Sequence, residues 1–171
     1  MTPRRPPLIV VSNTSPLTNL AAIGQLDLLH LIFGHLSIPQ SVFGELTFGG
    51  ISWPGAAEVA SAGWIHIRQV EPTHLIDALR LELDHGEAEA IALALQLKAD
   101  LILIDEQAGR EAARYLGLNV MGVVGFLVRA KQLGHIENVL PHLDALRQQA
   151  GFYLSESVYR HALSLAGEVS T

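Results

Sequence analysis

Short, uninterrupted apolar runs that alternate with helical patterns constrain the fold of this chain more than any other feature. Residues 8–11 and 101–104 are each four consecutive apolar residues, and polar residues follow both runs. Continuous runs of this kind are typical of strands that are covered on both faces, as in parallel sheets. Because the segments between the runs have helical patterns, the chain is predicted to form an α/β fold built on a parallel sheet.

The expected elements follow from local signals. Ser15 is a suitable N-cap and Pro16 a suitable first residue for a helix that ends at Gly24. The longest helical pattern starts at Gly86. Strands are predicted at residues 8–11, 36–38, 64–67, 101–104 and 119–121. Helices are predicted at residues 15–23, 26–33, 56–62, 86–98 and 107–116. A further short helix is predicted to begin at residue 39, and most of the chain after residue 122 is predicted to be helical. Residues 47–54 are predicted to form a loop.

Length and composition indicate one folded domain. The chain has 171 residues, and 49% of them are hydrophobic, which favours a single folded domain. This domain is predicted to span residues 8–171 and to include a helical C-terminal portion. Residues 1–7 are predicted to form a flexible tail before it. No apolar run reaches the roughly 18 residues of a membrane span. We therefore expect no membrane partner, and because the chain contains no cysteine we expect a cytoplasmic protein. The net charge of −6 argues mildly against a general nucleic-acid-binding surface but is compatible with an acidic metal site.

Several acids occupy positions where a charge is costly. Asp105 directly follows the run at 101–104, at the edge of a parallel sheet where ligands bind. Glu87 is the charged member of an apolar helical stripe, and Glu45 lies on the short helix after Pro39. Isolated charges are expensive to bury unless they are paired or bind a metal. Asn13 ends the first strand at the equivalent edge and offers an amide oxygen instead.

Each of these residues also has a structural interpretation. Asp105 suits the N-cap of the helix at 107–116 as well as it suits a ligand site. Glu87 would complement the helix dipole, and Glu45 alone is most often a surface acid. Thr14 and Ser15 offer hydroxyls for a phosphate or a metal-bound water, although Ser15 is expected to act as a cap.

Glu106, Arg110 and Arg114 follow Asp105 closely. Glu106 is either an accessory ligand or a solvated neighbour of Asp105. The two arginines are candidate phosphate contacts, whereas a solvated helix face is the commoner explanation. The pair Trp53 and Trp64 is interpreted as packing around a loop.

Other kinds of site lack their sequence signals. The eight histidines are scattered, with no His-x-His or His-x-x-x-His pair, which argues against structural zinc. The chain lacks the Gly-x-Gly-x-x-Gly fingerprint, the Gly-x-x-x-x-Gly-Lys loop and the Gly-x-Ser-x-Gly elbow. A phospho-acceptor receiver domain that uses Asp105 is disfavoured because the first strand lacks an acidic pair.

Four segments in order resemble the PIN domain, the nuclease fold of VapC-like toxins. They are Val10-Val11-Ser12-Asn13-Thr14-Ser15-Pro16-Leu17, Ile38-Pro39-x-x-Val42-x-x-Glu45-Leu46, Gly86-Glu87-Ala88-Glu89-Ala90-Ile91-Ala92-Leu93-Ala94 and Leu103-Ile104-Asp105-Glu106-x-x-x-Arg110. The nearest likeness is to a bacterial and archaeal branch that opens with Asn or Asp followed by Thr-Ser-Pro. The resemblance implies a three-layer α/β/α sandwich with a central parallel sheet and an acidic pocket at its C-terminal edge.

The resemblance also implies a chemistry. Asn13, Glu45, Glu87 and Asp105 match the family's metal-binding positions, and the three acids are the candidate catalytic residues. The expected cofactor is Mg²⁺ or Mn²⁺, which prefers carboxylate and water oxygens. The expected activity is hydrolysis of RNA phosphodiester bonds. The chain would then be the toxin of a toxin–antitoxin pair, a homodimer that a protein antitoxin inhibits.

Asn13 departs from the family's acidic pattern. It keeps an oxygen ligand but removes one negative charge, which lowers the expected metal affinity. A catalytically impaired PIN-fold module that binds protein or RNA is therefore the alternative function.

Overall fold

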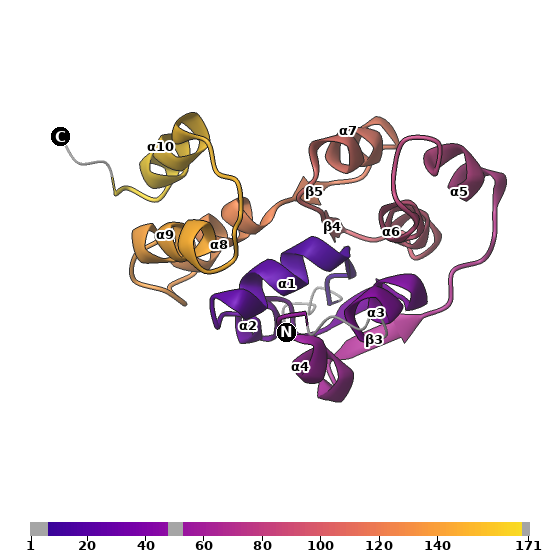
Figure 1. Ribbon diagram of the computed structural model, residues 1–171, viewed down its shortest axis with the longest axis horizontal. Coiled ribbons are helices and arrows are strands. Elements are labelled where there is room, and N and C mark those ends of the chain that lie inside the picture. The colour runs from indigo at the N-terminus through magenta and orange to yellow at the C-terminus, as the bar shows by residue number, and fades with distance from the viewer. Residues whose placement is uncertain (1–6, 48–52, 169–171) are drawn as a thin grey trace, which may run out of the picture.

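A five-stranded parallel sheet forms the centre of the computed structural model, which describes residues 7–47 and 53–168 (Figure 1). The strands are β1 (Val10–Ser12), β2 (Leu36–Pro39), β3 (Ile65–Arg68), β4 (Leu101–Leu103) and β5 (Val120–Met121). Their order in the sheet is β3-β2-β1-β4-β5, and all pairs are parallel. The direction in which the chain adds strands reverses between β1 and β4. In such sheets this reversal opens a crevice at the carboxyl ends of the strands.

Helices cover both faces of the sheet, which confirms the α/β/α sandwich. They are α1 (Thr14–Ala22), α2 (Asp27–Phe33), α3 (Gln40–Thr47), α4 (Ala56–Ser61), α5 (His74–Leu79), α6 (His85–Gln96), α7 (Gln107–Tyr115), α8 (Val123–Gln132), α9 (Leu140–Gln148) and α10 (Glu156–Leu165). Successive strand residues face opposite sides of a sheet. Val10 and Leu103 therefore pack with α1, α2 and α8, whereas Val11 and Ile102 pack with α6 and α7.

Most predicted elements are present, and the differences have physical causes. β1 begins at Val10 rather than at Leu8, and Leu8 and Ile9, which are 55% and 40% exposed, are not covered on both faces as the apolar run had suggested. The apolar surface of α6 is wider than one stripe, since the unpredicted helix α5 covers its outer side through Ile76. The predicted tail lies almost entirely outside the described residues, as does the centre of the predicted loop at 47–54.

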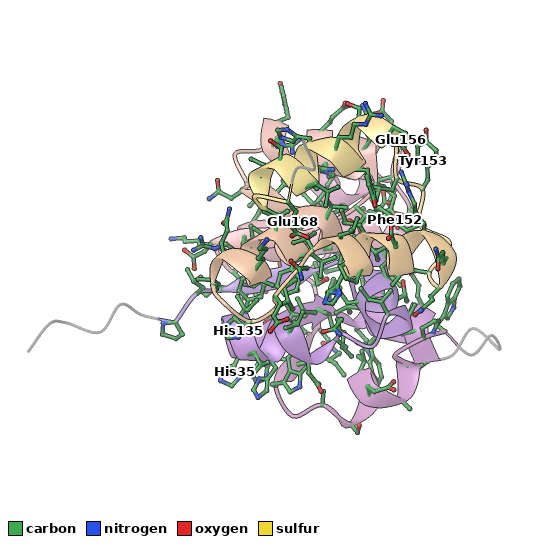
Figure 2. The ribbon with its side chains drawn as sticks, turned by 90° about the vertical axis from the view of Figure 1, so that its left-hand side faces the viewer. His35, His135, Phe152, Tyr153, Glu156 and Glu168 are labelled. Atoms are coloured by element: carbon green, nitrogen blue, oxygen red, sulfur yellow. The ribbon has the colours of Figure 1, made fainter. Side chains whose placement is uncertain are left out.

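Two charged side chains, Glu168 and Arg147, join the C-terminal helices through hydrogen bonds. In Figure 2, Glu168 lies beside α8 and α9. Its carboxylate accepts hydrogen bonds from Lys131 Nζ (3.0 Å) and from the backbone N–H groups of Val139 (2.7 Å) and Leu140 (3.1 Å). Burial alone would raise the pKa of Glu168, but these donors together lower it. Glu168 thus caps the start of α9 and ties the end of the chain to it.

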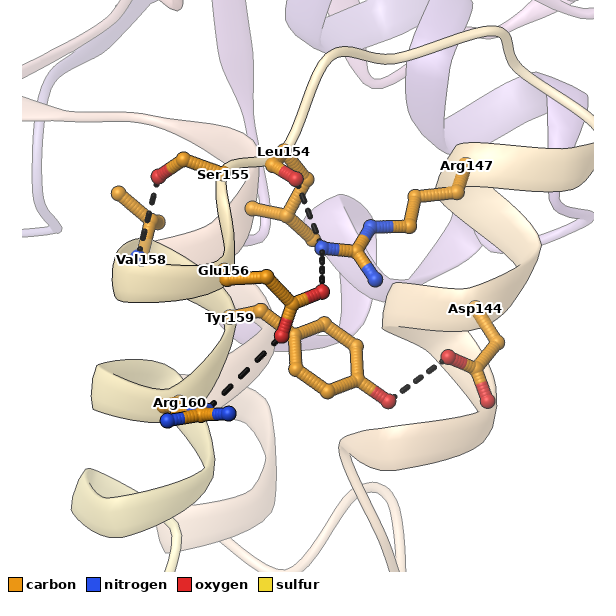
Figure 3. Close-up of polar contacts among 8 residues, drawn as sticks. All are labelled: Asp144, Arg147, Leu154, Ser155, Glu156, Val158, Tyr159 and Arg160. Atoms are coloured by element: carbon orange, nitrogen blue, oxygen red, sulfur yellow. Dashed lines mark hydrogen bonds and ion pairs between the residues drawn. The ribbon is translucent and has the colours of Figure 1, made fainter.

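Arg147 makes the second connection, between α9 and α10 (Figure 3). Its Nη2 donates to the carbonyl of Leu154 (2.7 Å) and to Glu156 (3.2 Å), and its guanidinium lies 4.3 Å from the ring centre of Tyr159. The hydroxyl of Tyr159 donates to Asp144 on α9 (2.8 Å).

Within the described ranges, no single helix is long and apolar enough to cross a bilayer. The pair α1 and α2 reaches that length and composition together but is bent by 117°.

Candidate functional site: an acidic pocket at the sheet edge

Asn13 and Asp105 lie on either side of the strand-order reversal. Asn13 directly follows β1, and its backbone N–H donates to the carbonyl of Leu103 on β4 (3.0 Å). The Asn13 side chain is 3% exposed, and its Oδ1 atom has no hydrogen-bond partner. Buried polar atoms normally have partners, so an unpartnered oxygen at a ligand-binding edge indicates a place for a water or a cation.

Asp105 is held by donors from two helices. Its Oδ1 accepts from the backbone N–H of Val123 (2.8 Å), and its Oδ2 accepts from Asn19 Nδ2 (3.2 Å). Of the two roles considered for Asp105, the cap of α7 is excluded: Glu106 occupies that N-cap position, and Asp105 instead accepts from the first backbone N–H of α8. Burial raises the pKa of Asp105 to about 6, although the two hydrogen bonds oppose the rise.

Glu87 enters the pocket from the first turn of α6. Asp84 precedes the helix as its N-cap, and its Oδ1 accepts from the backbone N–H of Glu87 (2.8 Å). The Glu87 residue is only 6% exposed. Burial is the largest cause that raises the pKa of Glu87 to about 7, and the charges of Asp84 and Glu106 raise it further. The positive end of the helix dipole alone would lower the pKa of Glu87. Burial and the neighbouring negative charges therefore outweigh the effect of the dipole.

Glu45 reaches the same pocket from α3. Thr14 Oγ1 donates to its Oε2 (2.6 Å), which joins the start of α1 to α3. A Cβ atom at Gly86 would lie 3.1 Å from Cδ of Glu45, so the carboxylate lies against the backbone of α6. The residue as a whole is exposed, yet burial raises the pKa of Glu45, while the Thr14 hydrogen bond opposes the rise.

Glu106 lies close enough to influence all three acids. Its negative charge raises the pKa of Glu45, Glu87 and Asp105. Ser15 Oγ donates to Glu106 Oε1 (2.5 Å). The prediction that Ser15 caps α1 is wrong, since the helix begins at Thr14 with Asn13 in the N-cap position.

Glycines on α7 and before α8 let the backbone approach these acids closely. A Cβ atom at Gly109 would meet the Ile104 side chain first and would also lie 3.6 Å from Glu87 Oε2, and one at Gly122 would lie 3.0 Å from Asp105 Oδ1. The same Cβ at Gly122 would lie 3.8 Å from a terminal nitrogen of Arg110. Side chains at Gly109 and Gly122 would therefore occupy the margin of the pocket.

The two candidate arginines differ in position. Arg110 lies beside Asp105, lowers its pKa, and carries a buried Nε without a hydrogen-bond partner. Arg114 is exposed one helical turn further along α7, and among the described residues its side chain makes no hydrogen bond or ion pair. The structure brings Arg110 to the pocket but not Arg114.

Sequence reasoning missed two residues that shape the site, Asp84 and Asn19. Asp84 stands three residues before Glu87, which is the spacing of a capping box, so a helix-start signal was present. The contact of Asn19 with Asp105 joins residues 86 positions apart, and no local pattern reveals it.

The pocket has the donor chemistry of a hard divalent cation. Across residues 7–47 and 53–168, no three His, Cys, Asp or Glu side chains already surround one point at metal-binding spacing. The acids are instead held by hydroxyl and amide donors. Their pKa values are nevertheless raised, mainly by burial and further by the charge of Glu106, and Asn13 Oδ1 lacks a partner. A cation would relieve both, so these oxygens fit Mg²⁺ or Mn²⁺.

Comparison with known families decides the assignment. A family model described as PIN domain matches residues 9–168, which include every element of the fold. The chain belongs to the PIN domain family. No curated protein matches the sequence. The PIN domain is a nuclease fold whose members generally use divalent metals, and the acidic pocket lies where this PIN domain reverses its strand order.

Proposed function

We propose that this PIN domain is a divalent-metal-dependent ribonuclease. The observation that carries the proposal is that Glu45, Glu87 and Asp105, from three separate elements, all lie close enough to Glu106 for its charge to raise their pKa values, at the sheet edge where Asn13 Oδ1 has no partner. Three carboxylates with raised pKa values in one crevice are unusual in a purely structural role, whereas active sites collect such groups.

Each side chain has a role that its environment supports. Asn13, Glu45, Glu87 and Asp105 would hold Mg²⁺ or Mn²⁺. When bound, the cation acidifies a coordinated water and neutralises charge on the phosphodiester. One of the three carboxylates would accept the proton that the attacking water releases.

The accessory residues complete this arrangement. Arg110 carries an unpartnered buried donor beside Asp105, and we assign it to a non-bridging phosphate oxygen. Thr14 and Ser15 orient Glu45 and Glu106 through their hydroxyl groups.

An RNA cleavage assay with Mn²⁺ tests the proposal. Wild-type protein should cleave single-stranded RNA only when Mn²⁺ or Mg²⁺ is present. Glu87→Gln should abolish cleavage and keep the fold, because glutamine has nearly the same shape. Arg114→Ala, outside the pocket, is the matched control and should cleave normally. Metal-independent cleavage, or equal cleavage by Glu87→Gln, would contradict the proposed mechanism.

The amide of Asn13 favours a second function, a PIN module with impaired catalysis that binds RNA or protein. In that case wild type binds Mn²⁺ weakly and leaves RNA intact, and Asn13→Asp restores both properties. If Asn13→Asp changes neither metal binding nor cleavage, the amide is irrelevant to the chemistry.

We also propose, from the family resemblance, that the protein is the toxin of a toxin–antitoxin pair. It would act in the cytoplasm as a homodimer and be inhibited by a protein antitoxin. Expression alone and together with the neighbouring reading frame, with growth as the readout, tests this role. Growth arrest that the second gene relieves is expected, and unaffected growth in both cases would contradict it.

A further inference from the structure

A cavity of about 210 Å³ lies between α5 and α6. Figure 1 shows these two helices side by side at one end of the molecule. Val70, Pro72 and Ile76 give the cavity an apolar side. Its volume is below the roughly 300 Å³ of typical drug-sized sites, so it suits a single planar ring system.

The cavity adjoins the acidic pocket through the first turn of α6. His85 lines the cavity and also lies close enough to Glu45 for its charge to affect the pKa of that residue. Glu89, one turn further along the same face of α6, also lines the cavity, accepts from Ser41 Oγ (3.0 Å) and pairs with His85 Nε2 (2.7 Å). These bonds fix the wall that separates the two sites. The cavity and the acidic pocket therefore share the first turn of α6.

Two unpaired charges of opposite sign lie at the cavity. Asp77 and Arg80 are three residues apart on α5 and its C-cap, so they lie on one face. In the described part of the chain, neither side chain makes a hydrogen bond or an ion pair, and they do not pair with each other. The cavity thus offers a free carboxylate acceptor and a free guanidinium donor beside an apolar surface.

We propose that this cavity binds one guanine base of the RNA strand that the acidic pocket cleaves. Arginine recognises the O6 and N7 acceptors of guanine. The N1–H and N2–H₂ donors on the neighbouring edge of the same base suit a carboxylate such as Asp77. Adenine, cytosine and uracil do not present both groups. Single-stranded RNA is read in this way, with bases splayed out against apolar or aromatic side chains. The inference rests on the proposed ribonuclease function.

A nuclear magnetic resonance titration of the ¹⁵N-labelled protein, without metal, tests base binding. The probes are GMP, AMP, CMP and UMP, which share ribose and phosphate, so any difference comes from the base. GMP should shift the amide signals of Ile76, Asp77 and His85. It should bind at least about fivefold more tightly than the other three, the lower end for one bidentate base contact. Equal affinities, or shifts confined to other regions, would overturn the inference.

Matched variants locate the effect. Asp77→Ala and Arg80→Ala should each remove the preference for GMP. Asp27→Ala, at another exposed first-turn acid, and Arg129→Ala, at another exposed arginine, should keep it. Unchanged amide spectra of the variants without nucleotide establish that they fold.

Cleavage assays separate this inference from the proposed function. In the expected result, wild type cuts RNA next to guanine, and Asp77→Ala cuts without that preference, with a raised KM and an unchanged kcat. RNA cleavage without guanine preference, together with equal binding of the four nucleotides, would refute the guanine site and leave the nuclease. Selective GMP binding without any RNA cleavage would refute the nuclease and retain the base site.

Discussion

Replacement of Gly86 by alanine should weaken metal binding without unfolding the protein. The new Cβ atom would lie 3.1 Å from Cδ and 3.3 Å from Oε2 of Glu45, and closer still to Oε1. Contacts this short require one group to move. The backbone of α6 is fixed by its helix, whereas Glu45 is exposed and has a flexible side chain. The carboxylate should therefore swing out of the pocket and lose its hydrogen bond to Thr14.

The two consequences of this change differ in size. Alanine in place of glycine stabilises a helix by about 0.5–1 kcal/mol, and loss of one exposed hydrogen bond costs about 0.5–1.5 kcal/mol. The free energy of unfolding should therefore change by less than about 1 kcal/mol. Removal of a metal ligand is more costly, since even loss of a group that only orients a ligand lowers affinity by about 10–100-fold. Mn²⁺ affinity should fall by at least about tenfold.

Calorimetric titration with Mn²⁺ and urea unfolding measure the two effects separately. Gly44→Ala is the matched control, because it lies beside Glu45 in α3 and a Cβ atom there meets open space. It should raise stability slightly and leave Mn²⁺ affinity unchanged. In a Glu45→Ala background, Gly86→Ala should have no further effect on affinity. Equal Mn²⁺ affinity in wild type and Gly86→Ala would refute the assignment of Glu45 to the metal site.

Two further predictions concern stability. Because the pKa of Glu87 rises from 4.5 to about 7 on folding, the folded protein holds a proton that the unfolded chain releases in this range. Without metal, the free energy of unfolding should therefore fall as the pH rises from about 4.5 to 7, and Glu87→Gln should reduce this fall in urea unfolding at pH 5 and 8. An unchanged pH dependence in the variant would show that the rise in pKa is absent. Arg147→Ala should destabilise the protein by about 1–3 kcal/mol in urea unfolding, since it removes two hydrogen bonds and a ring contact. The control Arg160→Ala, at an arginine whose side chain is 82% exposed, should cost under about 1 kcal/mol. Equal losses in the two variants would contradict the role of Arg147 in joining α9 to α10.

The positions of the acids could be predicted from the sequence because strand and helix ends have local signals. Asp105 follows a continuous apolar run and Glu87 begins a long helix, so the topology of a parallel sheet brings both to one edge. The partners of these acids were not predictable. The bond between Ser15 and Glu106 spans 91 positions, and only the folded structure brings them together. Helix α5 has six residues, too few for a periodic pattern to appear.

The hydrogen bond from Val123 to Asp105 makes the acidic pocket and the C-terminal helices mechanically dependent on each other. Asp105 is both a candidate ligand and the cap of α8, so a cation that draws on its carboxylate also changes the anchorage of that helix. Thermodynamic linkage makes the dependence mutual. Suppose that a second protein binds α8, α9 or α10 and shifts the start of α8. It would change the affinity for the cation by a certain factor, and the cation would change the affinity for that second protein by the same factor. If the cation binds as proposed, its affinity therefore depends on a surface that does not touch the acidic pocket.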